Sequence, residues 1–167
     1  MDQAKKQILN TRQIRQKIRR MAFEIYEQNY DARELVLAGV DDMGLKLSEF
    51  IKEEIEKISD IYCHLVRIDI DKEATSQPLV ELSEFPKLDD FTLILVDDVL
   101  NSGKTMAHAF DPFLKMSVRK IQTAVLVNRS HKRFPVAVDY RGLELATTIE
   151  EHIAVQLSDG DCSAYLY

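Results

Sequence analysis

Residues 97–105 place two acidic side chains next to a short loop of small and hydroxyl-bearing residues. Asp97 and Asp98 directly follow the apolar run 93–96. Carboxylates can accept hydrogen bonds from sugar hydroxyls or hold a divalent cation. A loop that opens a helix can present backbone N–H groups and the positive helix end to a phosphate. The residues of this loop are Asn101, Ser102, Gly103, Lys104 and Thr105. The segment therefore predicts a binding site for a sugar phosphate.

The same loop matches the end of the nucleotide-binding pattern G-x-x-x-x-G-K-[ST] at Gly103, Lys104 and Thr105. That pattern requires a glycine five residues before Gly103, where this chain has Asp98. A carboxylate at that position would repel the phosphates that the loop must enclose. The nucleotide-binding loop is therefore the weaker interpretation, and a generic strand–loop–helix unit is the structural alternative.

Apolar runs alternate with amphipathic segments along the chain, which predicts an α/β fold with a mainly parallel, twisted sheet flanked by helices on both faces. We expect strands over residues 35–40, 63–70, 92–97, 120–127 and 136–140. We expect helices over residues 12–28, 45–58 and 103–116. Ligands of such sheets bind at the carboxyl ends of the strands, where the acidic pair and the turns 40–44 and 128–131 fall.

Two further segments complete this outline. Residues 71–90 contain Pro78 and Pro86 and predict a loop, whereas residues 153–166 predict a C-terminal hairpin around Ser-Asp-Gly-Asp. A chain of 167 residues with 46% hydrophobic content is expected to form a single domain over 1–167.

Over residues 93–105 the chain resembles the type I phosphoribosyltransferases, whose signature is an apolar strand, two acidic residues and a loop ending in Thr/Ser-Gly-Lys/Arg-Thr. The resemblance implies the fold of that family and a site for 5-phosphoribosyl-1-pyrophosphate (PRPP). Asp97 and Asp98 would bind the ribose hydroxyls and Mg²⁺, and residues 101–105 would hold the 5-phosphate. The resemblance extends with gaps from about residue 10 to residue 148 and is strongest over 91–142. It also implies an N-terminal helix within 1–30 and a short hood over 69–90.

Residues 124–135 and 138–143 are similar to the pyrimidine operon attenuator / uracil phosphoribosyltransferase branch of that family. The similarity implies base contacts from Asn128, Arg129, Tyr140 and Arg141, with the Tyr140 ring lying over the base. An ordinary aromatic residue at a strand end is the alternative for Tyr140. Asn128 stands where purine enzymes commonly have a lysine, and Asn101 stands where they often have an aspartate. Both differences favour a uracil-like base.

The turn that would bind pyrophosphate departs from the family pattern. It consists of Asp41, Asp42, Met43 and Gly44, whereas relatives usually have Lys or Arg at the position of Met43. Two carboxylates there would repel pyrophosphate unless Mg²⁺ lies between them, and Lys46 could compensate. The hood is also short, and Lys72 could supply a cation or be a solvated loop lysine.

Composition and charge bear on whether the protein contacts membranes, metals or RNA. No apolar run approaches the ~20 residues needed to span a bilayer, and Cys63 and Cys162 have no metal-ligand spacing. We therefore expect a cytoplasmic protein without membrane contact. The net charge is −6, yet residues 1–20 hold seven Lys or Arg and one acid. Along 12–28 the basic side chains could bind RNA, remain solvated, or face the partner in a homodimer.

Three functions remain open. The first is a Mg²⁺-dependent phosphoribosyltransferase that joins PRPP to a nucleobase, with a uracil-like base favoured. The second is a nucleotide-sensing, RNA-binding regulator of pyrimidine genes on the same fold. The third is a PRPP-binding protein with weakened catalysis, which the altered pyrophosphate turn and the short hood would support.

Overall fold

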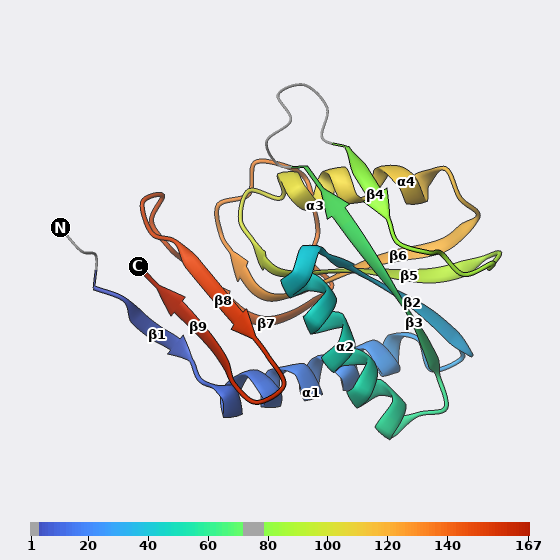
Figure 1. Ribbon diagram of the computed structural model, residues 1–167, viewed down its shortest axis with the longest axis horizontal. Coiled ribbons are helices and arrows are strands. Elements are labelled where there is room, and N and C mark those ends of the chain that lie inside the picture. The colour runs from blue at the N-terminus through green and yellow to red at the C-terminus, as the bar shows by residue number, and fades with distance from the viewer. Residues whose placement is uncertain (1–3, 72–78) are drawn as a thin grey trace.

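The computed structural model describes residues 4–71 and 79–167, and its centre is a mainly parallel sheet (Figure 1). The strand order is β4-β3-β2-β5-β6-β7, with only β4 antiparallel to its neighbour among these described strands. Their bounds are Glu34–Val40 (β2), Tyr62–Ile70 (β3), Val80–Leu82 (β4), Phe91–Leu100 (β5), Val118–Arg129 (β6) and Tyr140–Leu145 (β7). The α/β fold with a mainly parallel sheet is confirmed.

Helices cover both faces of this sheet, as the alternating pattern predicts (Figure 1). Helices α1 (Thr11–Gln28) and α2 (Asp41–Ile58) pack on one face, and the short helices α3 (Lys104–Ala109) and α4 (Asp111–Leu114) pack on the other. The central strands β2 and β5 are buried on both sides, which explains their almost continuous apolar sequence. Each face has its own cluster of buried apolar side chains.

A second, three-stranded sheet joins segments from the two ends of the chain. It has the order β1-β9-β8, with β1 at Lys6–Leu9, β8 at Ile153–Leu157 and β9 at Cys162–Leu166. Strands β8 and β9 form the predicted C-terminal hairpin. Strand β1 pairs with β9 and is too short to give a clear sequence pattern.

Helix α1 is predictable because its apolar residues recur at helical spacing. Ile14, Ile18, Met21, Ala22 and Ile25 are its buried residues. The helix begins with a capping box, in which the Asn10 side chain accepts the Gln13 N–H and the Gln13 side chain accepts the Asn10 N–H. These bonds satisfy donors that would otherwise lack partners at the first turn.

The largest differences from the expected element boundaries are in α2, β5, the helix over 103–116 and β7. Helix α2 begins at Asp41 rather than residue 45, and β5 continues through the acidic pair to Leu100 because these residues also pair with β6. The helix expected over 103–116 is two short helices, since Pro112 lies in the first turn of α4. Residues 136–139 are irregular, and β7 begins only at Tyr140.

The region expected to be a loop over 71–90 contains β4, which pairs with the end of β3. Lys72 lies outside the described residues. No helix in the described part of the chain is long and apolar enough to cross a membrane. Both cysteines are buried free thiols, and burial raises the pKa of Cys63 to about 12.

Candidate functional site

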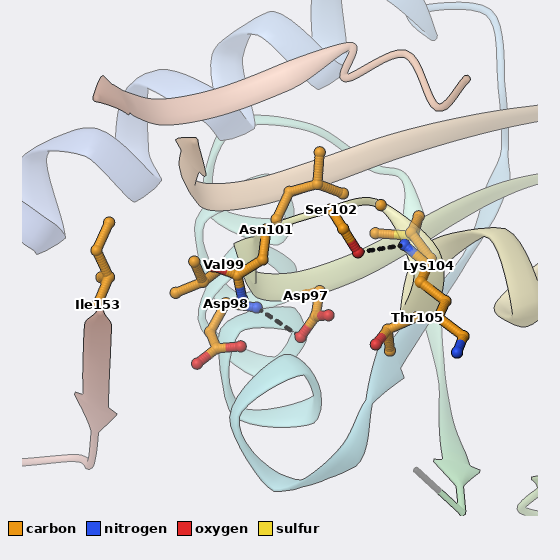
Figure 2. Close-up of a pocket in the computed structure, with 11 residues that line it drawn as sticks. Asp97, Asp98, Val99, Asn101, Ser102, Lys104, Thr105 and Ile153 are labelled. Atoms are coloured by element: carbon orange, nitrogen blue, oxygen red, sulfur yellow. Dashed lines mark hydrogen bonds between the residues drawn. The ribbon is translucent and has the colours of Figure 1, made fainter. Parts of the chain in front are cut away.

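A cavity of about 240 Å³ opens at the carboxyl end of β5 (Figure 2). Its lining consists of the continuous segment 97–106 together with Ile153 from β8. The structure therefore brings the acidic pair and the predicted phosphate loop to one cavity. Ile153 is not among the predicted site residues, because it is distant in the sequence and only the packing of β8 near β5 brings it here.

The acidic pair lies within strand β5 rather than after it. Successive side chains of a strand point to opposite faces, and Figure 2 shows Asp98 extending toward the side of Ile153 and Asp97 toward the side of Thr105. Asp97 is only 8% exposed, and its Oδ1 accepts the Asp98 N–H at 2.9 Å. Asp98 is half-buried. The two carboxylates thus have different environments, and Asp98 is the more accessible.

The shape of the loop after β5 depends on Gly103 and on hydrogen bonds from a second loop. Gly103 has φ +87°, a conformation that favours glycine, and it immediately precedes α3. The Ser102 Oγ accepts the Lys104 N–H at 3.3 Å (Figure 2). The Ser102 carbonyl accepts the N–H groups of Arg133 and Phe134 at 2.9 and 3.1 Å. The polar atoms of Ser102 are therefore held in fixed positions beside the cavity.

The start of α2 lies against the same end of β5. A Cβ on Gly44 would be 2.7 Å from the Val96 carbonyl oxygen and 3.5 Å from the Asp97 Cα. A Cβ on Gly39 would be 2.4 Å from the Leu45 backbone. Only glycine permits these approaches, so the two glycines place the predicted pyrophosphate turn next to the acidic pair.

Within that turn, the side chains face different surroundings. Met43 is half-buried and packs against the apolar cluster on the α1–α2 face of the sheet. Asp41 adopts φ +52°, and its Oδ1 accepts the Ile70 N–H at 3.4 Å. Asp42 is exposed, and its Oδ1 lies 2.6 Å from Nη1 of Arg67.

Arg67 is a cation near this turn that sequence reasoning missed. Its Nε also lies 2.8 Å from Oδ1 of Asp69, and hydrogen bonds to Asp42 and Asp69 raise the pKa of its guanidinium. Lys46, expected to compensate the turn, instead pairs with Glu49 at 3.0 Å and Asp159 at 2.7 Å. An ion pair between residues 25 positions apart leaves no local sequence signal, which is why Arg67 could not be identified from the motif.

Two of the predicted base contacts lie at the carboxyl end of β6. The buried Arg129 guanidinium donates to Oδ1 of Asn101 at 2.9 Å and to Oγ1 of Thr147 at 2.8 Å. It also donates to the carbonyls of Thr148 and Glu151 at 3.0 and 2.7 Å. Asn128 is 4% exposed, and its Oδ1 is one of two buried side-chain polar atoms without a hydrogen-bond partner in the described structure. Arg129 therefore ties the phosphate loop to residues 147–151, whereas Asn128 retains an unused acceptor.

The other two predicted base contacts are not brought to this cavity. Tyr140 is 2% exposed, and its hydroxyl donates to Oε1 of Gln122 at 2.9 Å and accepts from Nδ2 of Asn29 at 3.4 Å. Burial raises the pKa of its phenol to about 12. Arg141 is exposed and its Nε pairs with Glu144 at 3.0 Å. Both residues lie near α1, because the Arg20 guanidinium donates to the Arg141 carbonyl at 2.7 Å.

The donors available for a cation are few. The described residues contain no group of three or more His, Cys, Asp or Glu side chains arranged to hold a metal ion. Asp97 and Asp98 offer oxygen ligands at the cavity, which is the ligand type that Mg²⁺ prefers. This donor set fits a Mg²⁺ ion that takes its other ligands from substrate phosphates and water.

Comparisons with known proteins identify the family of this chain. The family model described as the phosphoribosyl transferase domain matches residues 4–159. The chain is 35% identical over 164 residues to the bifunctional protein PyrR of Bacillus pumilus, covering 92% of this chain and 91% of that protein. It is 33% identical over 169 residues to the bifunctional protein PyrR of Deinococcus radiodurans, covering 96% and 92% of the two chains.

Among solved structures, a hypoxanthine phosphoribosyl transferase from Trypanosoma cruzi superposes with a TM-score of 0.76 at 17% identity. The alignment covers 85% of this chain and 78% of that one, and it supports the fold. The expected likeness to the branch that includes PyrR is confirmed by the sequence relatives. From its sequence match and its fold, the chain belongs to the phosphoribosyl transferase domain family.

Proposed function

We propose that this protein transfers the phosphoribosyl group of PRPP to a nucleobase, with a uracil-like base favoured, and releases pyrophosphate. The observation that carries the proposal is one cavity that contains both the acidic pair and the 101–105 loop, with the start of α2 packed beside it. In the reaction, the bond from ribose C1 to the pyrophosphate oxygen breaks, and a bond from C1 to a base nitrogen forms.

Each part of the cavity has a proposed role in this transfer. Asp98 and Asp97 accept hydrogen bonds from the ribose hydroxyls and favour the positive charge that develops on the sugar. The loop 101–105 holds the 5-phosphate through its N–H groups, the hydroxyls of Ser102 and Thr105, and the charge of Lys104. The protein contributes mainly by positioning the two reactants. Mg²⁺, when bound, would neutralise negative charge on the leaving pyrophosphate.

For base binding, we propose that some of the predicted residues keep a role at the cavity and that others have a structural role. Asn128 remains a candidate, because its buried Oδ1 can accept a hydrogen bond from a ring N–H. Ile153 supplies an apolar contact at the cavity, and Arg129 positions Asn101 and residues 147–151 around it. Tyr140 and Arg141 lie nearer α1, and their surroundings favour a structural role.

A second candidate function is regulation through RNA binding, which the exposed basic side chains of α1 would support. On α1, Arg12 and Arg19 are exposed, whereas Arg15 lies over the Phe50 ring at 3.7 Å. The surface available to RNA is therefore smaller than the sequence suggests. RNA titrations at two salt concentrations test it, because phosphate contacts give an affinity that falls steeply with salt. An Arg12→Ala, Arg19→Ala double variant should lose that affinity.

The transferase is tested by adding uracil, hypoxanthine or guanine to the protein with PRPP, in the presence and absence of Mg²⁺, while pyrophosphate release is monitored. Release that depends on one base and on Mg²⁺ supports the proposal and identifies the base. Binding of PRPP without release for any base would contradict catalysis and leave a binding protein. A homodimer, expected from the family, is checked separately by sedimentation equilibrium.

A further inference from the structure

A second cavity, the α1 groove, lies along helix α1. Its described lining comes from Ile8 and Leu9 of β1, from side chains within 13–20 of α1, and from Leu143 of β7. Strand β1 leads into α1 (Figure 1), and β7 is an edge strand of the central sheet. The volume is about 540 Å³, compared with about 240 Å³ for the cavity at β5, and the two cavities share no lining residue. A cavity of this size can hold a small organic ligand.

Apolar side chains from two strands form one part of the α1 groove. Leu9 is buried, whereas Ile8 and Leu143 are half-buried and pack against the apolar cluster on the α1–α2 face of the sheet. Ile8 and Leu143 therefore keep apolar surface that remains open to the groove. A ligand with an apolar body would remove this surface from water, which favours binding.

The polar part of the α1 groove contains cations and amides, and no carboxylate is among its described lining residues. Lys17 is half-buried and makes no hydrogen bond or ion pair with the described part of the chain. Burial, followed by the nearby charge of Arg20, lowers the pKa of Lys17. An anion beside Lys17 would offset both effects. The exposed side chains of Gln13 and Gln16 can add amide N–H donors.

Arg20 lies at the limit of this positive region. Its Nη2 donates to the carbonyls of Arg141 and Gly142 at 2.7 and 2.9 Å, and its Nε lies 3.2 Å from Oε1 of Glu24. These contacts hold the guanidinium at the edge of β7. An anion is therefore favoured beside Lys17 and disfavoured beyond Arg20, where the adjoining cavity has an acidic lining. The acidic residues of that adjoining cavity are Glu24, Asp139 and Glu144.

We propose that the α1 groove binds a small organic anion with an apolar body, of which a medium-chain carboxylate is the simplest example. The anionic group pairs with Lys17, and the apolar body lies against Ile8 and Leu143. Charge selects the ligand, because a cation without a partner in the described chain stands beside open apolar surface. Arg12 and Arg19, the side chains considered for RNA, do not line this groove. The site is therefore separate from that surface, and it does not depend on the proposed transfer reaction.

Fluorescence titration of the full chain with 8-anilinonaphthalene-1-sulfonate tests the site, because this probe joins one sulfonate to an apolar body. The probe should bind at a single site per chain, and octanoate should displace it at a concentration about tenfold below that needed with octanol or acetate. Octanol has the same chain without the charge, and acetate has the charge without the chain. Equal displacement by octanol and octanoate would overturn the proposal. Displacement by ribose 5-phosphate would place the probe in the cavity at β5 and would overturn it as well.

Substitutions on α1 test which group holds the anion. Lys17→Gln removes the charge and should weaken octanoate binding about tenfold. Gln16→Glu adds a carboxylate at an exposed position of the lining and should weaken octanoate binding about threefold. The matched control is Lys57→Gln, which removes a lysine paired with Glu54 in the last turns of α2 and should leave octanoate binding unchanged. Unchanged binding in both Lys17→Gln and Gln16→Glu would contradict the proposal, whatever the transferase assay shows.

Discussion

At the scale of single residues, neighbouring side chains of one type have different roles. Asp97 is buried and held by the Asp98 N–H, whereas Asp98 is half-buried at the cavity. The strand geometry separates them, since adjacent side chains leave a strand on opposite faces. We therefore expect Asp98 to contribute most to ligand contact and Asp97 to contribute more to the shape of the site.

Replacing Asp98 by Asn tests this assignment. The substitution removes a charged acceptor, so ribose 5-phosphate binding should weaken about tenfold, while the free energy of unfolding changes by less than about 1 kcal/mol. Titration calorimetry and urea unfolding measure the two effects. Asp111→Asn on α4, which removes an exposed pair with Lys115, serves as the control. Unchanged affinity in Asp98→Asn would remove Asp98 from the site.

Tyr140→Phe distinguishes a lid over the base from a buried structural residue. The variant removes the hydroxyl that bonds Gln122 and Asn29, so the free energy of unfolding should fall by about 1–2 kcal/mol. The affinity for the base should not change. Urea unfolding and base titration in the presence of PRPP provide the measurements. A loss of base affinity at constant stability would restore the lid function to Tyr140.

At the scale of elements, helix α2 depends on two glycines for its place. Gly39 in β2 and Gly44 in α2 allow the helix to pass close to its own strand and to the end of β5. The position of Met43 follows from this packing, because the helix turns its side chain toward the apolar cluster. The start of α2 is thus fixed by close backbone contacts. These contacts determine which surroundings the side chains of residues 41–44 have.

Gly44→Ala should displace the start of α2. The new methyl group would lie 2.7 Å from the Val96 oxygen, so we expect a loss of about 2 kcal/mol in the free energy of unfolding, with weaker ribose 5-phosphate binding. Gly160→Ala is the matched control, since nothing lies within 4 Å of a Cβ there. Equal stabilities of the two variants, measured by urea unfolding, would contradict this account of α2.

The elements also show what the sequence can and cannot predict. The 12–28 helix is predictable because its buried face requires apolar residues at a period of 3.6. The 35–40 strand is predictable because it is buried on both faces and is therefore a continuous apolar run. The acidic pair and the phosphate loop are contiguous, so their proximity is predictable too. The positions of Arg67 beside the turn 41–44 and of Ile153 at the cavity are not predictable, because contacts between segments distant in the sequence place them there. The start of α2 escapes prediction because Asp41 begins the helix with φ +52°.

At the scale of the whole molecule, buried titratable groups in the core make the free energy of unfolding depend on pH. Cys63 and Tyr140 belong to the same apolar cluster on the α1–α2 face. Burial raises the pKa of each to about 12, from 9.0 for the thiol and 10.0 for the phenol. The unfolded chain therefore releases these protons at lower pH than the folded chain does. The contribution of these two groups to the free energy of unfolding is fully present below pH 9 and is lost as the pH rises toward 12.

We expect the free energy of unfolding to fall by about 2 kcal/mol between pH 8 and pH 10.5 through Cys63 alone. Urea unfolding at the two pH values measures the difference, and the variant Cys63→Ala should show a smaller one, whatever its stability at pH 8. An equal difference in the variant would mean that the thiol does not ionise on unfolding in this range.

The pairing of β1 with β9 constrains the order in which the chain can fold during its synthesis. The Thr11 hydroxyl donates to the carbonyl of Cys162, 151 residues away, and β1 lies beside β9 in the finished fold (Figure 1). On the ribosome, the strands from β2 to β7 can assemble before this partner emerges, because long-range pairing is the slow step of folding. A nascent chain would then carry the acidic pair and the phosphate loop but lack Ile153. The lining of the cavity is complete only once the β8–β9 hairpin has been synthesised, because that hairpin supplies Ile153.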